Sequence, residues 1–300
     1  MIKMKTKVSI KAEHILEVQK SYSTYYSCLG KIDASKITKD ILSTSKVHDQ
    51  IKIIQRYQKE SIQNKKILEI GSGYGLFVAV GVIDYNADVY GVEPSALGFG
   101  GSFEMAQKIL VSNNLEQSRI VCAVAEDLPF EDNFFDIVYS TNVFEHVNDP
   151  EKAFSEAIRV CKPGGLIQIV IPNYGSFYEG HYACWYIPYT PKKLWKLWLK
   201  YVLKRDPSYA DTLRTNLNYF SVQRYLKPFK DANVIAVLSM GEEIFFERMN
   251  TGDFVPYVGL TKVQHALSLL KKCKLVWLIS KILMVVKSHS PLIVTIRKKN

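Results

Sequence analysis

The chain has 300 residues, of which 47% are hydrophobic, and it carries a formal net charge of +10 at pH 7. This length and composition indicate a soluble globular unit with a substantial core, rather than a disordered chain. Its five cysteines form no C-x-x-C pair, which argues against a zinc ribbon or a disulfide framework. We therefore expect a cytoplasmic protein, because the N-terminus also lacks the apolar core of a signal peptide.

The charge is unevenly distributed along the chain. Residues 66–172 hold 15 acidic and 6 basic side chains, a net −9, which leaves 14 acidic and 33 basic side chains, a net +19, in the flanks. Basic flanks suit an anionic acceptor, a nucleic acid or an anionic membrane surface. Solvated lysines without a partner are an equally acceptable interpretation.

Four zones follow one another in the sequence. We predict an N-terminal helical leader over residues 1–64, a core with alternating strands and helices over 65–173, an aromatic-rich insertion over 174–230, and a completion of the sheet over 231–300. The alternation in the core predicts a Rossmann-like α/β fold, with a seven-stranded, mostly parallel sheet and helices on both faces. The strands expected here are 66–70, 88–92, 119–124, 135–140, 166–171 and 292–297, and the helices begin at Leu76, Phe103 and Pro150.

Two boundaries in the core have clear local signals. Asp149 precedes Pro150 and Glu151, which predicts a helix with an aspartate cap, a proline at its first position and acidic residues near its positive end. Lys162-Pro163-Gly164-Gly165 is expected to stop that helix and turn the chain into the next strand.

A glycine-rich loop follows the first core strand. Gly71, Gly73 and Gly75 place bare backbone where a ligand must approach closely, since side chains there would collide with it. A dinucleotide fingerprint requires glycine or alanine at position 76, where this chain has Leu76, so the spacing argues against a dehydrogenase. Glu93 ends the next strand about twenty residues later and is placed to accept hydrogen bonds from ribose hydroxyls, although a solvated strand-end carboxylate is the alternative.

With these motifs, residues 66–173 resemble class I S-adenosylmethionine-dependent methyltransferases, of the type 11 group that includes ubiquinone-biosynthesis enzymes. The resemblance rests on an ordered series of segments, not on the glycine loop alone. These are Leu68-Glu69-Ile70-Gly71-Ser72-Gly73-Tyr74-Gly75, Val92-Glu93-Pro94-Ser95, Ala125-Glu126-Asp127-Leu128-Pro129-Phe130 with Phe135-Asp136, Phe144-Glu145-His146-Val147, and Lys162-Pro163-Gly164-Gly165.

The resemblance implies S-adenosylmethionine as the cofactor. Glu69 and Gly71 would hold its amino-acid part, Glu93 its ribose, and Ala125 and Glu126 would border its adenine. The remaining cofactor-binding residues implied are Ser72, Gly73, Tyr74, Gly75, Pro94, Asp127 and Asn142. The family often has an acidic residue where this chain has Val124, so the adenine contact is in doubt.

Methyl transfer to a hydroxyl requires alignment of the acceptor and removal of its proton. Asn142, Glu145 and His146 follow a core strand and should lie at the carboxyl edge of the sheet, where open α/β sheets bind ligands. We therefore name Glu145 and His146 as catalytic candidates, although His146 equally fits a capping or packing role. The pair is similar to Glu-x-x-Glu-His metal sites of some methyltransferases, but Asn142 replaces the first glutamate, so we expect no metal.

His181 is the preferred base. It lies in Tyr178-Glu179-Gly180-His181-Tyr182, within the insertion that is expected over the active site. The insertion is rich in aromatic residues that suit a sugar, a ring or a lipid headgroup. Leu194, Leu197, Trp198 and Tyr201 recur at helical spacing, which also fits an amphipathic helix packed on the core. The insertion loosely resembles bacterial surface-polysaccharide methyltransferases.

Residues 263–287 mix apolar residues with lysines. Their apolar runs are shorter than the about twenty residues needed to span a bilayer. They suit either a peripheral helix at the inner face of the membrane or a lysine-edged helix packed on the sheet.

From these patterns we predict an S-adenosylmethionine-dependent O-methyltransferase that acts on a sugar or glycan precursor through a histidine base. The alternatives are a small-molecule or quinone-type lipid methyltransferase, an RNA methyltransferase, and a non-catalytic cofactor-binding scaffold. Nucleic acid is the less favoured partner, because the strand ending Ser140-Thr141-Asn142-Val143 lacks the Asp/Asn-Pro-Pro-aromatic signature of many nitrogen methyltransferases.

Overall fold

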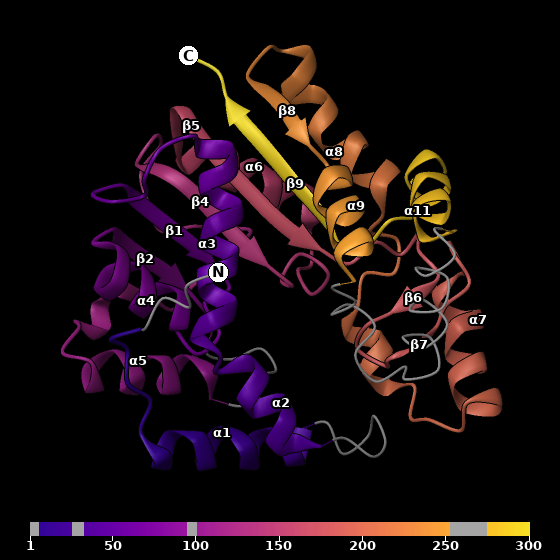
Figure 1. Ribbon diagram of the computed structural model, residues 1–300, viewed down its shortest axis with the longest axis horizontal. Helices are drawn as coiled ribbons and strands as arrows, with labels where there is room; N and C mark the ends of the chain where they lie inside the picture. The colour runs from indigo at the N-terminus through magenta and orange to yellow at the C-terminus, as the bar shows by residue number, and fades with distance from the viewer. Residues whose placement is uncertain (1–5, 26–32, 95–100, 253–274) are drawn as a thin grey trace. The chain divides into compact units, whose positions relative to one another are not determined.

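The structure, a computed structural model, describes residues 6–25, 33–94, 101–252 and 275–300 (Figure 1). Its strands are β1 Lys66–Ile70, β2 Asp88–Val92, β3 Ile120–Val121, β4 Phe135–Thr141, β5 Cys161–Ile171, β6 Tyr178–Glu179, β7 Cys184–Trp185, β8 Ile235–Ser239 and β9 Leu292–Lys298. Its α-helices are α1 Ala12–Tyr25, α2 Ala34–Ile41, α3 Thr44–Gln58, α4 Leu76–Tyr85, α5 Ser102–Ser112, α6 Pro150–Val160, α7 Lys192–Leu197, α8 Tyr219–Asp231, α9 Glu242–Thr251 and α11 Leu275–Val285.

The main sheet of the described chain has seven strands in the order β3-β2-β1-β4-β5-β9-β8. β1 is parallel to both of its neighbours. Leu68 pairs with Tyr90 of β2 on one side and with Val138 of β4 on the other. β2 is parallel to β3. Figure 1 shows β1, β2 and β4 of the first part of the chain lying side by side. The predicted Rossmann-like α/β fold is confirmed.

Helix α6 begins as its sequence predicts. The Asp149 side chain accepts a hydrogen bond of 3.1 Å from the backbone N–H of Lys152, and Pro150 occupies the first helical position. The cap satisfies a donor that the first turn leaves without a partner inside the helix.

Two strand boundaries differ from the prediction. β3 covers only Ile120–Val121, because the chain then turns and Val124 forms an isolated bridge with Asp127. β5 begins at Cys161, ahead of the predicted Lys162–Gly165 turn, because Cys161 is already extended with φ −76° and ψ 137°. Lys298 donates a 2.8 Å hydrogen bond from Nζ to the Cys161 carbonyl, which gives this extended residue a partner outside the helix.

The chain divides into two compact units. The first comprises residues 1–143, 147–168 and 297–300, and the second comprises 144–146 and 169–296. Within the second unit, the buried Trp195 ring contacts the Tyr182 and Tyr186 rings edge to face, with centroid distances of 5.4 and 5.5 Å. The four-zone division with boundaries at 64, 173 and 230 stays a prediction.

No helix among the described residues is both long enough and apolar enough to cross a membrane.

Candidate functional site

The turn after β1 has the geometry of a ligand-binding loop. The N–H groups of Gly71 and Ser72 both donate to the Val92 carbonyl, at 2.8 and 2.9 Å, which ties the turn to the end of β2. Gly71 and Gly73 have φ of +75° and +50°, a region that favours glycine. A Cβ added at Gly71 would collide with the Val143 side chain, whereas one added at Gly73 would meet no atom within 4 Å. The backbone at Gly73 therefore borders open space.

Glu93 closes this turn from the neighbouring strand. Its Oε2 accepts a 2.9 Å hydrogen bond from the Gly73 N–H, and its Oε1 accepts a 2.7 Å hydrogen bond from the Ser102 hydroxyl at the start of α5. Burial raises the pKa of Glu93, and the bonds from Ser102 and Gly73 oppose that rise. Sequence reasoning named Glu93 but missed Ser102, whose only signal was its position at the start of a predicted helix.

Glu69 is a buried carboxylate on β1, two residues before Gly71. Among the described residues, none makes a hydrogen bond to its Oε2. Burial, reinforced by the charge of Glu93, raises its pKa well above the ordinary value. A buried acceptor without a donor is costly, so the site lacks a cationic or N–H donor at this point. The amino group of an amino-acid ligand supplies such a donor, and S-adenosylmethionine therefore fits the residues present.

The other predicted cofactor residues of the first unit lie around this turn and on the loop after β3. Tyr74 is buried, and its ring centroid lies 6.2 Å from that of Tyr22 on α1. Burial raises the pKa of Tyr74 to about 12. The Glu126 carboxylate accepts from the backbone N–H groups of Asn148 and Asp149, at 2.6 and 3.2 Å, so it is engaged in fixing the approach to α6.

The remaining residues of this prediction differ in exposure. Ala125 is buried, and the Asp127 N–H donates to Val124 O at 3.2 Å. Asn142 follows β4 with φ +54° and is exposed. Pro94 ends the described segment, and Ser95 lies outside the described residues.

In the second unit, His181 occupies the turn of a short antiparallel hairpin formed by β6 and β7. Its Nδ1 lies 2.7 Å from Glu179 Oε1, and the other oxygen of Glu179 accepts a 2.7 Å hydrogen bond from the Tyr182 N–H. Burial acts to raise the pKa of Glu179, but His181 and these hydrogen bonds bring it below its ordinary value. An ionised Glu179 favours a proton on Nδ1, so in the neutral imidazole the lone pair lies on His181 Nε2.

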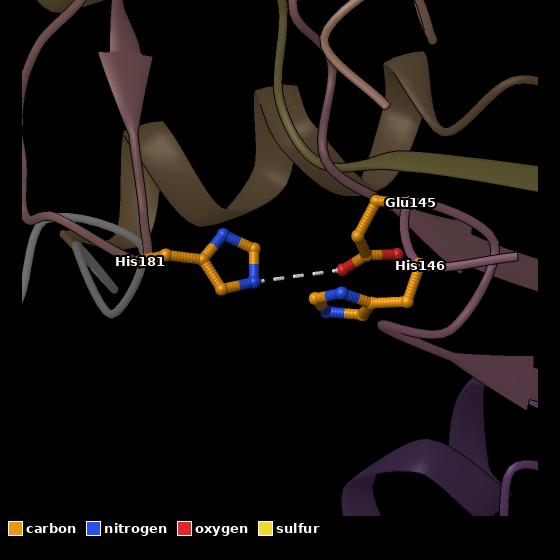
Figure 2. A group of neighbouring side chains, drawn as sticks. All are labelled: Glu145, His146 and His181. Atoms are coloured by element: carbon orange, nitrogen blue, oxygen red, sulfur yellow. Dashed lines mark ion pairs between the residues drawn. The ribbon is translucent and has the colours of Figure 1, made fainter. Parts of the chain in front are cut away.

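Glu145 and His146 face this imidazole from the segment after β4 (Figure 2). His181 Nε2 lies 3.9 Å from Glu145 Oε1, and the His146 and His181 rings stand edge to face with centroids 5.4 Å apart. The Glu145 carbonyl accepts a 2.7 Å hydrogen bond from the Arg214 N–H, which fixes the backbone of this segment. The Tyr209 ring lies beside both histidines, with centroids 5.5 and 6.3 Å away.

The three titratable groups have different environments. Burial raises the pKa of Glu145 to about 7, and the His181 charge opposes that rise. Burial, together with the charge of His181, lowers the pKa of His146 to about 4. Burial also acts to lower the pKa of His181, but the Glu179 charge and hydrogen bond outweigh it and the pKa is raised. Perturbed groups gathered in this way are typical of functional sites.

All three catalytic candidates, Glu145, His146 and His181, thus lie together in one unit. Sequence reasoning missed the orienting role of Glu179, although the Glu-x-His spacing within Tyr178–Tyr182 was available as a signal. Tyr209 stood out in the sequence only as one of many aromatic residues.

The prediction that the apolar face of the insertion helix packs on the core is wrong. Leu194, Leu197, Trp198 and Tyr201 are all exposed. The buried residues of this stretch are Trp195 and Leu199, and α7 continues as a π-helical turn over Trp198–Val202.

Known proteins match part of this chain. Residues 68–169 match the family described as methyltransferase domain. The chain is 32% identical over 109 residues to glycine/sarcosine/dimethylglycine N-methyltransferase of Actinopolyspora halophila, a match that covers 36% of this chain and 18% of that protein. It is 28% identical over 141 residues to phosphoethanolamine N-methyltransferase 2 of Caenorhabditis elegans, covering 46% and 30% respectively.

A solved structure from Galdieria sulphuraria, proposed as a sarcosine dimethylglycine methyltransferase, superposes with a TM-score of 0.51 at 14% identity, over 94% of this chain and 98% of that one. This likeness shows the fold. The matched segments span less than half the length of the curated relatives. The ordered motifs, the domain match and the fold agree, and residues 68–169 belong to the class I, S-adenosylmethionine-dependent methyltransferase domains.

Proposed function

We propose that the whole chain is an S-adenosylmethionine-dependent methyltransferase whose acceptor is a hydroxyl group of a sugar or glycan precursor. The observation that carries the proposal is the cluster of titratable groups in the second unit, Glu145, His146 and His181. In the first unit, Glu69 Oε2 receives no hydrogen bond from another described residue, which suits the amino group of the cofactor. Methyl transfer is an in-line displacement in which the acceptor forms a bond to the methyl carbon as the bond to sulfur breaks. An alcohol must lose its proton during this step, so a hydroxyl acceptor requires an activating group.

The cofactor residues divide the ligand among them. Glu69 pairs with the amino group of the methionine part, and the Gly71–Gly75 turn leaves room for the ligand to approach the backbone. Glu93 holds the ribose, because a carboxylate at the end of the second strand accepts hydrogen bonds from its hydroxyls. The Gly73 N–H and the Ser102 hydroxyl donate hydrogen bonds to the Glu93 carboxylate, which hold it at the end of β2.

His181 activates the acceptor hydroxyl. Glu179 holds Nδ1, and Nε2 lies 3.9 Å from Glu145 Oε1. Replacing His181 with alanine removes this group, and turnover is expected to fall by about 10²- to 10⁴-fold. His14→Gln, on α1 of the first unit, is the matched control. Near-normal turnover of His181→Ala would assign His181 a structural role and leave His146 as the candidate.

A sugar acceptor is supported by the aromatic residues of the second unit, because aromatic faces with polar edges suit such rings. A second candidate is an amine acceptor, which the names of the N-methyltransferase relatives favour. The distinguishing experiment incubates the protein with methyl-labelled S-adenosylmethionine and fractionated lysate of the source cell, followed by mass analysis. Label on a sugar oxygen supports the proposal, label on an amine supports the second candidate, and label in RNA overturns both.

We also propose a peripheral contact with an anionic membrane. Of the predicted segment 263–287, residues 263–274 lie outside the described residues. In the rest, α11 exposes Trp277, Leu278, Ile282 and Val285, and the Lys281 ammonium lies 4.5 Å from the Trp277 ring centroid. An apolar face edged by lysines suits a membrane interface.

Flotation with liposomes tests this contact. The protein is expected to float with acidic phospholipid vesicles and less with neutral ones, and Trp277→Ser with Ile282→Ser should reduce flotation. A protein that stays in the soluble fraction with both lipids has no such contact.

A further inference from the structure

The cluster in Figure 2 has three potential metal ligands that come from segments far apart in the sequence. Glu145, His146 and His181 each turn a donor atom inward, and these atoms all lie within 4.8 Å of one another. Sequence reasoning expected no metal because Asn142 replaces a glutamate of a known motif. That reasoning considered only neighbours of Glu145, whereas the third donor here is His181, 36 positions farther along the chain.

The first observation that favours a cation is the environment of the Glu145 carboxylate. Its side chain is 1% exposed, and neither carboxylate oxygen receives a hydrogen bond from another residue of the described chain. Leaving a buried acceptor without a partner is costly, and more so for a charged group. A cation between Glu145 and the histidines would satisfy these oxygens.

The second sign is that each histidine ring has a hydrogen-bond partner outside the cluster. Glu179 holds Nδ1 of His181 at 2.7 Å, and the ring of His146 makes a hydrogen bond to the Thr212 backbone. Histidines that bind metals commonly use the second nitrogen in this way, toward a carboxylate or a backbone carbonyl, which fixes the ring and the free lone pair.

The spacing also suits an ion better than a direct contact. His181 Nε2 and Glu145 Oε1 are 3.9 Å apart, which is too long for a hydrogen bond. Two donors bound to one ion at about 2.1 Å in tetrahedral geometry lie about 3.4 Å apart, so this pair has to close by about half an ångström. The three donor atoms lie within 4.8 Å of one another, so the widest pair has to close by at most about 1.4 Å. Two histidines and one carboxylate are ligands suited to zinc and other divalent transition metals.

We propose that Glu145, His146 and His181 bind a divalent transition-metal ion that coordinates the acceptor hydroxyl. Three protein ligands leave a coordination position open, as in catalytic zinc sites. The inference rests on the proposed function for its role, and it specifies how His181 acts, as a ligand of the ion rather than as the proton acceptor itself.

The reactants are the acceptor hydroxyl and S-adenosylmethionine. The bound ion lowers the pKa of the coordinated hydroxyl, whose proton passes to water. The oxygen then forms its bond to the methyl carbon, and the carbon–sulfur bond breaks with its electron pair left on sulfur. The products are the methyl ether and S-adenosylhomocysteine.

Metal titration of the full chain tests the inference without any acceptor. The purified protein is stripped with a chelator and titrated with Co²⁺, followed by visible absorption, and with Zn²⁺ in competition. One equivalent of Co²⁺ is expected to bind. Glu145→Gln and His181→Gln should weaken Co²⁺ binding at least 100-fold, and Glu179→Gln, which removes only an orienting charge, should weaken it about 10- to 100-fold.

The controls separate metal binding from folding and from the proposed function. His14→Gln, distant in sequence from the cluster, should bind Co²⁺ like the wild type, and melting of each chelated variant shows whether it folds. His146→Gln replaces any ligand variant that does not fold. A wild-type protein without a Co²⁺ site, or folded ligand variants with unchanged affinity, would overturn the inference.

S-adenosylhomocysteine binding, measured by calorimetry in chelator, is the separate readout. If it binds and methyl transfer proceeds without metal, the inference fails and the proposed function stands. If Co²⁺ binds as expected but S-adenosylhomocysteine does not, the proposed function fails and the metal site stands.

Discussion

Alanine at Gly71 and alanine at Gly73 should have different effects. The first should clash with a neighbouring side chain of the protein, and the second should clash with the bound ligand. Both residues have positive φ, so alanine at either position costs roughly 1–2 kcal/mol of backbone strain. At Gly71 the new Cβ also collides with Val143, whereas at Gly73 it meets no protein atom within 4 Å. The melting temperature should therefore fall further for Gly71→Ala than for Gly73→Ala.

For ligand affinity, Gly73→Ala is the variant that tests the assignment. At Gly73 the methyl group enters open space that we assign to the cofactor, so S-adenosylhomocysteine binding should weaken about tenfold or more, which corresponds to about 1.4 kcal/mol or more. Strain alone should lower the melting temperature by about 2–4 °C per kcal/mol for a chain of this size class. Scanning calorimetry and titration calorimetry measure the two quantities.

The double variant Gly71→Ala with Val143→Ala is the matched control, since removing the valine branches should restore part of the stability lost in Gly71→Ala. If Gly73→Ala binds S-adenosylhomocysteine as tightly as the wild type, the cofactor does not approach this backbone and the assignment of the turn is refuted.

Three further variants test neighbouring parts of the first unit. Glu69 must be ionised to pair with an ammonium group, so cofactor affinity should rise as pH increases through its raised pKa, and Glu69→Gln should bind weakly with that dependence removed in pH-resolved calorimetry. Glu93→Gln should weaken S-adenosylhomocysteine binding by about 1.5–3 kcal/mol, the range for hydrogen bonds to charged groups, and an unchanged dissociation constant would remove Glu93 from the ribose site. Arg159 donates to the Leu128 and Phe130 carbonyls at 2.9 and 2.8 Å, so Arg159→Met should lower the free energy of urea unfolding by about 1–3 kcal/mol, while exposed Arg224→Met should not.

The local signals in the first unit were strong because each depends on neighbouring residues. Asp149 and Pro150 start α6 through a cap and a fixed φ, and the glycines after β1 supply a turn that other residues adopt only with strain. Strand ends of a parallel sheet meet at one edge, so the order of the segments was sufficient to predict that Glu69, Gly71 and Glu93 share a site. The length of β3 was not predictable. Residues 119–124 look like one strand in the sequence, but only Ile120 and Val121 pair with β2.

The face of a helix and the partners of a buried group depend on contacts that are distant in the sequence. Leu194 and Trp195 are adjacent and both apolar, yet only Trp195 packs against Tyr182 and Tyr186, since these rings come from another segment.

The sequence by itself determined the fold class and the glycine turn after β1, because periodicity, capping and glycine spacing are local properties. It also named Glu145, His146 and His181 as separate candidates. Only the tertiary structure decided that the three gather around one point, that Glu179 fixes the tautomer of His181, and that the oxygens of Glu145 are buried without a hydrogen bond from another described residue. Burial and long-range contact create these properties, and no pattern of neighbouring residues encodes them.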